Sequence, residues 1–196
     1  MNLNTKQEIL EVLTMPEETF WSQVAPAARE VCQKQFGTSL LVTAMLAYTN
    51  ICKNQCLYCG MRAGNKIPRY RMSPEEILPL AQRAREDGLG RMFLLAGEDQ
   101  NYGFEKLLTL IAGLRQQGYT IALGAGELSR TQYQELHDAG VEEYVLKFEM
   151  SHPDSFQRLN PLHQPMPSEW AAPVDQRGWH EIGFREHCRL AGTDLG

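Results

Sequence analysis

Short apolar segments alternate with segments of helical period along most of the chain, and this alternation constrains the fold more than any other feature. The apolar segments suit buried strands, which we expect at residues 39–49, 91–96, 119–123 and 143–148. Helices are expected at residues 74–86, 104–117, 130–139 and 153–159. Strands and helices that alternate in this way form a parallel sheet with right-handed crossovers. The sequence therefore predicts the α/β class, with four β/α units.

Local signals mark both ends of the first of these helices. Ser73 is a good N-cap residue, Pro74 suits the first helical position, and Glu76 is placed to complete a capping box. The helix is expected to stop at Asp87-Gly88, because glycine favours the backbone conformation that follows a helix end.

Residues 1–38 form a separate N-terminal segment that we expect to be helical, with a helix around residues 17–34. Cys32 lies on the apolar face of that helix. We expect it to pack against other residues and not to bind a metal.

Length and charge exclude several classes of protein. The 196 residues are too few for a complete (β/α)8 barrel, which usually takes about 250. A formal net charge of -5 disfavours nucleic acid and anionic membranes as partners, because both attract a basic surface. No apolar run approaches the roughly 18 residues of a membrane span, and no signal peptide is recognisable. We therefore expect a cytoplasmic protein.

Three of the five cysteines, Cys52, Cys56 and Cys59, fall within eight residues in a C-x3-C-x2-C pattern. This spacing wraps one loop around a metal centre, and thiolates bind both iron–sulfur clusters and zinc. A structural zinc site needs a fourth ligand at short spacing, and the next histidine is His137. Three ligands would leave one iron of a four-iron cluster open for chemistry. Zinc and reduced cysteines in a buried loop stay as alternatives.

The cysteine pattern, with Tyr58 just before its last cysteine, resembles the signature of the radical S-adenosylmethionine (SAM) enzymes. The end of the second expected strand, Gly97-Glu98-Asp99, resembles the glycine-glycine-glutamate motif of the same superfamily. Within it, residues 48–161 are most similar to the group of the [FeFe]-hydrogenase maturase, biotin synthase and methylornithine synthase. The residues that carry this likeness also include Asn50, Gly60, Met61, Arg62, the run at 69–76, and Glu149.

The resemblance implies a partial radical SAM (β/α) barrel, of the TIM-barrel type, at residues 39–161. It implies a [4Fe–4S] cluster on Cys52, Cys56 and Cys59, whose open iron binds SAM and cleaves it reductively to a 5′-deoxyadenosyl radical. It also implies a small-molecule substrate and a low-potential electron donor such as ferredoxin or flavodoxin.

The resemblance further assigns four residues to SAM. Glu98, with Gly97 beside it, would accept a hydrogen bond from the methionine ammonium, Glu149 would bind the ribose hydroxyls, and Tyr58 would lie near the adenine. Carboxylates suit these roles because an ammonium and sugar hydroxyls need acceptors. Without the resemblance, Glu98 would cap the following helix and Glu149 would pair with Lys147.

Other residues carry weaker signals. The turn from Gly124 to Glu127 either lines the SAM pocket or is a simple small-residue turn. Lys147 stands where the maturases lead us to expect an arginine, and the two cations are not equivalent for bidentate contacts, so its role stays open. We assign no role to the histidines.

The β/α pattern stops after Pro161, and residues 162–196 show neither helical nor strand periodicity. A family member would continue through four more β/α units, with a glycine-rich strand and a Gly-Leu-Pro-Gly-Gln-Thr-like run. Read one nucleotide later, synonymous codons for residues 178–196 permit the string AGMKSAFGNIAGLPGQTL, which contains both features. We therefore expect the reading frame to be lost between Pro161 and Gln176, which makes Cys188 a by-product. The rival explanation is a short protein with a divergent C-terminal extension.

The sequence thus predicts a radical SAM enzyme most like the [FeFe]-hydrogenase maturase. The alternatives are an enzyme of the biotin synthase or methylornithine synthase type, or an inactive fragment that binds a cluster but does not hold SAM productively.

Overall fold

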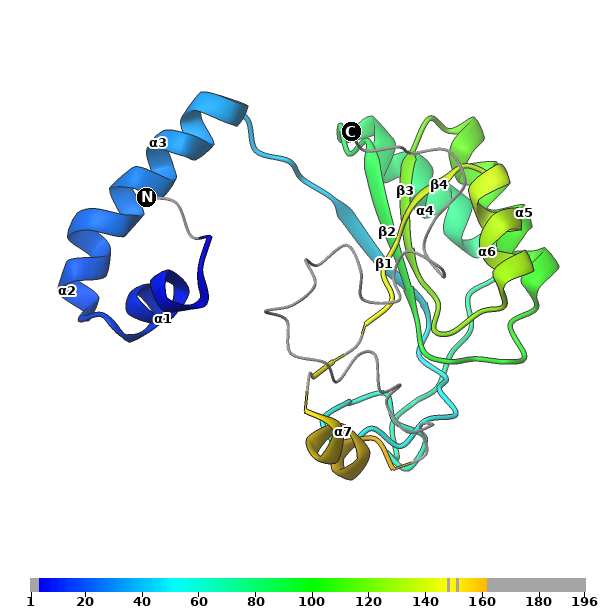
Figure 1. Ribbon diagram of the computed structural model, residues 1–196. Coiled ribbons are helices and arrows are strands. Elements are labelled where there is room, and N and C mark those ends of the chain that lie inside the picture. Colours follow the sequence, from blue (N-terminus) through cyan, green and yellow to red (C-terminus); the bar gives the residue numbers. More distant parts are fainter. Residues whose placement is uncertain (1–3, 148, 151, 162–196) are drawn as a thin grey trace. The chain divides into compact units, whose positions relative to one another are not determined.

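The computed structural model describes residues 4–147, 149–150 and 152–161 (Figure 1). The expected loss of the reading frame falls on residues 162–196 and lies outside the described residues. The chain divides into two compact units, one ending at Leu41 and the other beginning at Val42. None of the helices in the described part of the chain is both long and apolar enough to cross a membrane.

The first unit is built from helices. These are α1 (Lys6–Thr14), α2 (Glu17–Thr19), the π-helical turn η1 (Phe20–Val24) and α3 (Ala25–Phe36). The last three follow one another and confirm the helix expected around residues 17–34. Helix α1 lies within the segment expected to be helical, but its bounds were not predicted, although Thr5 and Glu8 form a capping box at its start that the sequence alone displays.

The expectation that Cys32 packs inside the protein is wrong, because Cys32 is exposed. No residue of α3 is buried, and the apolar side chains of Val31 and Phe36 on the same helix are 61% and 68% exposed. Helical spacing shows that residues share a face. It does not show that a second element covers that face.

The second unit contains the predicted four-stranded parallel sheet, and its strand order is β1-β2-β3-β4. Its strands are β1 (Ala44–Thr49), β2 (Arg91–Ala96), β3 (Thr120–Gly124) and β4 (Val141–Tyr144). The helices are α4 (Pro74–Glu86), α5 (Phe104–Gln116), α6 (Arg130–Asp138) and α7 (Pro153–Leu159). Because all strands run in one direction, their carboxyl ends meet at one edge of the sheet.

Local signals placed some boundaries well. Strand β2 and helix α7 begin and end as expected, and α4 begins with the predicted capping box of Ser73 and Glu76. Gly88 follows α4 with a φ of 89°, a conformation that glycine adopts without strain.

Strands β1 and β4 were predicted with wrong bounds, and β3 lies one residue later than expected. Strand β1 begins at Ala44, opposite Met92 of β2, and not at residue 39, because residues 39–43 have no partner strand. Strand β4 covers residues 141–144 and not 143–148, since its pairing with β3 begins at Val141 and ends at Tyr144. Hydrophobicity alone does not reveal where a neighbouring strand ends.

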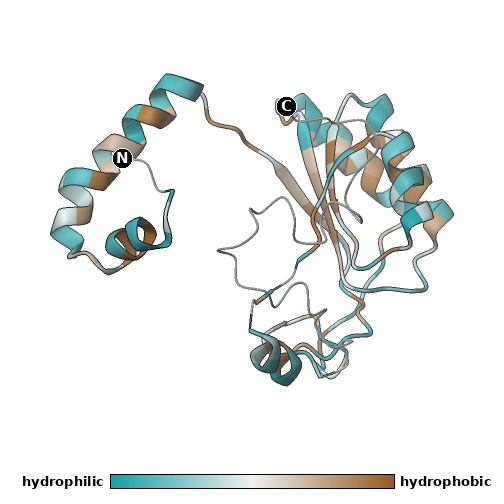
Figure 2. Ribbon diagram, in the orientation of Figure 1, coloured by the Kyte–Doolittle hydropathy of each residue, from teal (hydrophilic) through white to brown (hydrophobic). Residues whose placement is uncertain are grey.

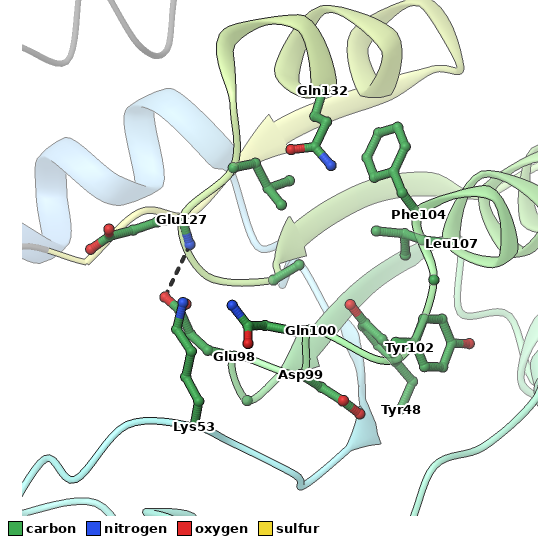
Figure 3. A pocket seen from close by; sticks show the side chains of 14 residues that line it. Tyr48, Lys53, Glu98, Asp99, Gln100, Tyr102, Phe104, Leu107, Glu127 and Gln132 are labelled. Atoms are coloured by element: carbon green, nitrogen blue, oxygen red, sulfur yellow. Dashed lines mark hydrogen bonds and ion pairs between the residues drawn. The ribbon is translucent and has the colours of Figure 1, made fainter. Parts of the chain in front are cut away.

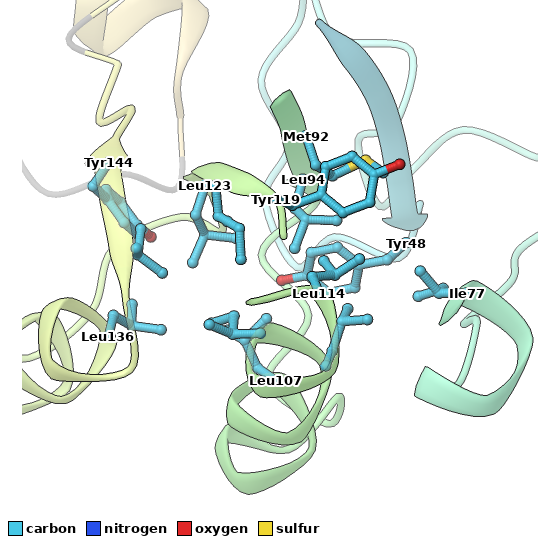
Figure 4. Packing of buried hydrophobic residues seen from close by; sticks show 14 of the residues in the cluster. Tyr48, Ile77, Met92, Leu94, Leu107, Leu114, Tyr119, Leu123, Leu136 and Tyr144 are labelled. Carbon is cyan, nitrogen blue, oxygen red and sulfur yellow. The ribbon is translucent and has the colours of Figure 1, made fainter. Parts of the chain in front are cut away.

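The core lies between the sheet and helices α4, α5 and α6 (Figures 1 and 4). Leu94 and Leu123 from the sheet are fully buried, as are Leu110 and Leu114 from α5. Figure 2 shows the apolar residues of these helices where they face the strands. The alternate residues of β2, Phe93 and Leu95, are only half-buried, so the two faces of the sheet differ in how well they are covered.

Replacing Leu110 with alanine should destabilise the second unit by about 2–5 kcal/mol, because the side chain is fully buried and its loss leaves a cavity. The matched control is Leu80→Ala, since Leu80 is 37% exposed and its truncation should cost much less. Urea unfolding followed by circular dichroism measures both. Equal losses for the two variants would contradict the described core.

Candidate functional site

The three clustered cysteines lie in the loop that joins β1 to α4, here called the cysteine loop (residues 50–73). All three are free thiols and half-buried. A turn brings two of them together, since the Cys59 N–H donates to the Cys56 carbonyl at 3.0 Å. The loop leaves the carboxyl end of β1, which is the edge where enzymes of this architecture carry their chemistry.

Arg69 holds the two sides of the cysteine loop together. Its guanidinium donates four hydrogen bonds of 2.6–3.0 Å to the carbonyl oxygens of Asn50, Met61, Arg62 and Asn65. Carbonyl groups in a loop without regular structure need such donors, and only arginine offers this many in a fixed plane. Sequence reasoning gave Arg69 no role, although it belongs to the run that carries the family likeness.

The cysteine loop contacts the end of β2 at Gly97. A Cβ on Gly97 would clash with the carbonyl oxygen of Ile51 and lie 2.8 Å from the Cβ of Cys52, so only glycine fits. The Glu98 N–H then donates to Cys52 Sγ at 3.3 Å, and the Lys53 N–H donates to the Glu98 carbonyl at 3.1 Å. The structure thus brings the first cysteine together with Gly97 and Glu98.

The Glu98 carboxylate is engaged on both oxygens. Oε1 accepts the Glu127 N–H at 3.1 Å, and Oε2 lies 3.2 Å from Lys53 Nζ. The alternative that Glu98 caps the next helix is wrong, because α5 follows Gly103 and has no side-chain cap. A Cβ on Gly126, which has a φ of 82°, would lie 2.7 Å from this carboxylate. The turn at residues 124–127 is therefore both a small-residue turn and part of the surroundings of Glu98.

Asp99 anchors the turn that follows β2. Its carboxylate accepts two hydrogen bonds from Arg71, at 2.6 and 2.8 Å, and one from Thr49 Oγ1 at 2.8 Å. The side chain is 2% exposed. Burial alone would raise the pKa of Asp99, but the bonds from Arg71, Thr49 and the Asn101 N–H outweigh it and lower the pKa. The resemblance had included Asp99 in the motif without giving it a role.

A second cluster surrounds Tyr58. Its hydroxyl donates to Asn160 Oδ1 at 2.8 Å, and Asn160 is fully buried at the end of α7. The cysteine loop is also tied there by a bond of 2.9 Å from the Leu57 N–H to the Leu159 carbonyl. Burial, and then the nearby Glu149 carboxylate, raise the pKa of Tyr58. Sequence reasoning missed Asn160, and no pattern around it points to this role.

Glu149 adopts a φ of 61°, which residues other than glycine seldom take. Lys147 Nζ lies 3.9 Å from its Oε1, so the pairing considered as an alternative is present as a long, partly exposed contact. Such strained conformations concentrate at functional sites. The strain marks Glu149 as a residue held in place by its surroundings.

The thiols of the cysteine loop lie within electrostatic reach of one another. Burial raises the pKa of Cys56, while a hydrogen bond with Tyr58 lowers it and the neighbouring Cys52 and Cys59 raise it further. Within the described residues, no group of three or more His, Cys, Asp or Glu side chains is already arranged to hold a metal ion. Three soft sulfur donors on one loop, one of them accepting an N–H, nevertheless match the donor set and the N–H···S contacts typical of iron–sulfur sites.

A cavity of about 320 Å³ lies beside Glu98, at the carboxyl ends of β1, β2 and β3 (Figure 3). Figure 3 shows Lys53 and Glu98 at one side of it and Phe104 and Leu107 at the other. Of the expected site residues within the described ranges, Gly97 and Glu98 line this cavity, whereas Tyr58 and Glu149 do not. The cavity combines charged and apolar walls, as small-molecule sites do.

Comparison with known proteins decides the family. The sequence profile of the radical SAM superfamily matches residues 46–171. The chain belongs to the radical SAM superfamily. Membership implies an iron–sulfur cluster and SAM as cofactors.

Several relatives of this radical SAM chain are known. It is 31% identical to the [FeFe] hydrogenase maturase subunit HydE of Thermotoga maritima, over 80% of this chain and 45% of HydE. It is 24% identical to 3-methylornithine synthase of Methanosarcina acetivorans, over 78% of this chain and 44% of that protein. The chain thus spans about half the length of the curated relatives it matches.

Solved structures confirm the fold. The crystal structure of methylornithine synthase (PylB) matches with a TM-score of 0.76 and 22% identity, over 82% of this chain and 48% of that one. The [FeFe]-hydrogenase maturase HydG matches with a TM-score of 0.73 and 24% identity, over 81% and 37%. At these identities the likeness concerns the fold alone.

Because the pKa of Asp99 is lowered in the folded protein, its ionised form stabilises the fold more than its protonated form does. The ionised carboxylate stabilises the fold above the ordinary pKa of Asp, and this stabilisation is lost as the pH falls through the lower, folded value. We expect Asp99→Asn to lower the Tm at pH 6 and to make the fall in Tm between about pH 5 and pH 2 shallower than in the wild type.

Thermal unfolding at a series of pH values measures this difference. The control is Asp87→Asn, which removes an exposed carboxylate at the end of α4 and should leave the pH dependence close to that of the wild type. If Asp99→Asn lost Tm as steeply as the wild type on acidification, the role given to the Arg71 and Thr49 contacts would be wrong.

Proposed function

We propose that this chain binds a [4Fe–4S] cluster through Cys52, Cys56 and Cys59 and binds SAM beside it, with the amino-acid part of SAM in the cavity next to Glu98. The observation that carries the proposal is the contact between Cys52 Sγ and the Glu98 N–H. It supports a common site because it joins the first cysteine to the backbone of Glu98, whose side chain lines the cavity.

Three residues would hold SAM. The Glu98 carboxylate would accept a hydrogen bond from the ammonium group of SAM, because this side chain is 15% exposed and borders the cavity. Glu149 would accept hydrogen bonds from the ribose hydroxyls, and the strain in its backbone supports a functional role. Tyr58 would lie near the adenine, and its bond to the buried Asn160 would keep the ring in place. Gly97 would contribute by its small size, which lets the cysteine loop reach the strand end.

When bound, the reduced cluster would supply one electron to the SAM sulfonium, whose C5′–S bond would break to give methionine and a 5′-deoxyadenosyl radical. The chain's own residues would orient the SAM ammonium, ribose and adenine relative to the cysteine loop. A low-potential donor such as ferredoxin or flavodoxin would supply the electron, and a small molecule would be the substrate. The 31% identity with HydE supports an activity of the hydrogenase maturase type.

The first test concerns the metal. Anaerobic reconstitution with iron and sulfide should give about four irons per chain, and Cys52→Ala, Cys56→Ala or Cys59→Ala should each lose most of them. Iron analysis and the absorbance near 400 nm measure the loading. Cys32→Ala is the matched control, because Cys32 is exposed and lies in the first unit. A colourless protein with one zinc per chain would overturn the cluster assignment.

The second test concerns SAM. Removing the negative charge with Glu98→Gln should weaken SAM binding to the reconstituted protein about tenfold or more, because a charge-assisted hydrogen bond is lost. The control is Glu105→Gln, an exposed position in the first turn of α5. Equilibrium dialysis measures the affinity. Equal affinity in wild type and Glu98→Gln would contradict the role of Glu98.

Adding dithionite to the SAM complex separates an active enzyme from an inactive fragment. We expect 5′-deoxyadenosine, detected by liquid chromatography, from the wild type and much less from Glu98→Gln. Bound iron and bound SAM without any 5′-deoxyadenosine would favour the inactive fragment, which the half-length match to the relatives keeps open.

A further inference from the structure

Within the described residues, Lys53 is the only charged side chain that forms an ion pair with the Glu98 carboxylate. Its Nζ lies 3.2 Å from Oε2, while Oε1 is taken by the backbone N–H of Glu127. The two partners differ in kind. The N–H belongs to the turn after β3 and is fixed, whereas the ammonium ends a flexible side chain that is 50% exposed. Lys53 is therefore the partner that can leave.

The backbone around Lys53 is held by hydrogen bonds that do not involve its side chain. Its N–H donates to the Glu98 carbonyl at 3.1 Å, and the preceding Cys52 accepts the Glu98 N–H. Lys53 also lines the cavity, and Figure 3 shows its side chain running up to the Glu98 carboxylate. The geometry thus delivers a primary ammonium to the acceptor that the ligand's own ammonium needs.

We propose that the Lys53 ammonium is a placeholder for the amino group of the ligand. It holds the acceptor position on Glu98 in the ligand-free chain and leaves when an amino-acid ammonium binds there. This inference rests on the proposed binding of SAM at Glu98. If Lys53 covers the site for part of the time, the apparent Kd of the ligand equals its intrinsic Kd divided by the fraction of molecules in which the site is free. Lys53 therefore lowers the affinity for ligands that carry an ammonium and leaves the affinity for other ligands unchanged.

The test compares two probes on the anaerobically reconstituted full-length protein. SAM carries the amino-acid part, whereas 5′-methylthioadenosine has the same nucleoside but no ammonium. We expect Lys53→Met to tighten SAM binding roughly two- to fivefold, the range expected for a half-exposed ion pair, and to leave 5′-methylthioadenosine unchanged. Lys53→Arg, which keeps the positive charge, should bind SAM with an affinity close to that of the wild type.

The matched control is Lys66→Met, which removes another exposed lysine from the cysteine loop and should change neither affinity. Equilibrium dialysis gives each dissociation constant. Weaker SAM binding by Lys53→Met would mean that Lys53 holds the ligand itself, and equal tightening of both probes would mean a structural effect. Each of these results overturns the inference.

The outcomes also separate this inference from the proposed function. If wild type and Lys53→Met bind SAM equally well, the placeholder role is wrong and the SAM site stands. If neither protein binds SAM, the proposed function fails and the inference fails with it.

Discussion

The close approach of Gly97 to the cysteine loop is the contact on which the rest of the site depends. Because Gly97 has no side chain, the turn after β2 packs against Ile51 and Cys52. The next two residues both line the cavity and have different partners: the Glu98 carboxylate pairs with Lys53, and the Asp99 carboxylate is anchored by Arg71. A larger residue at position 97 would separate the cysteine loop from the end of β2 and would displace Glu98 and Asp99 together.

The sequence predicted those parts of the fold that local patterns determine. Strand β2, helix α7 and the start of α4 follow from apolar runs and from capping residues such as Ser73 and Glu76, which act within a few positions of themselves. The parallel direction of the strands follows from the alternation of strands and helices. The cysteines, Gly97 and Glu98 were found because their spacing resembles a known signature.

The remaining features depend on contacts between distant segments, which no local pattern displays. Strand β1 starts only where β2 offers a partner, and Cys32 is exposed because nothing in the first unit covers its helix face. Sequence reasoning gave Lys53 no role, and its pairing with Glu98 spans 45 positions in sequence. The bond from Tyr58 to Asn160 joins residues 102 positions apart. Such pairings are fixed by the tertiary fold.

The four hydrogen bonds that Arg69 donates to carbonyl groups also fix a positive charge in the cysteine loop. Residues 50–72 contain five basic residues and no acidic one, in a chain whose formal net charge is -5. A guanidinium keeps its positive charge at any pH a protein tolerates. The segment that carries the three clustered cysteines thus has an excess of basic side chains in an acidic protein, although Lys53 and Arg71 are paired with Glu98 and Asp99. This excess lowers the energetic cost of gathering anionic thiolates there.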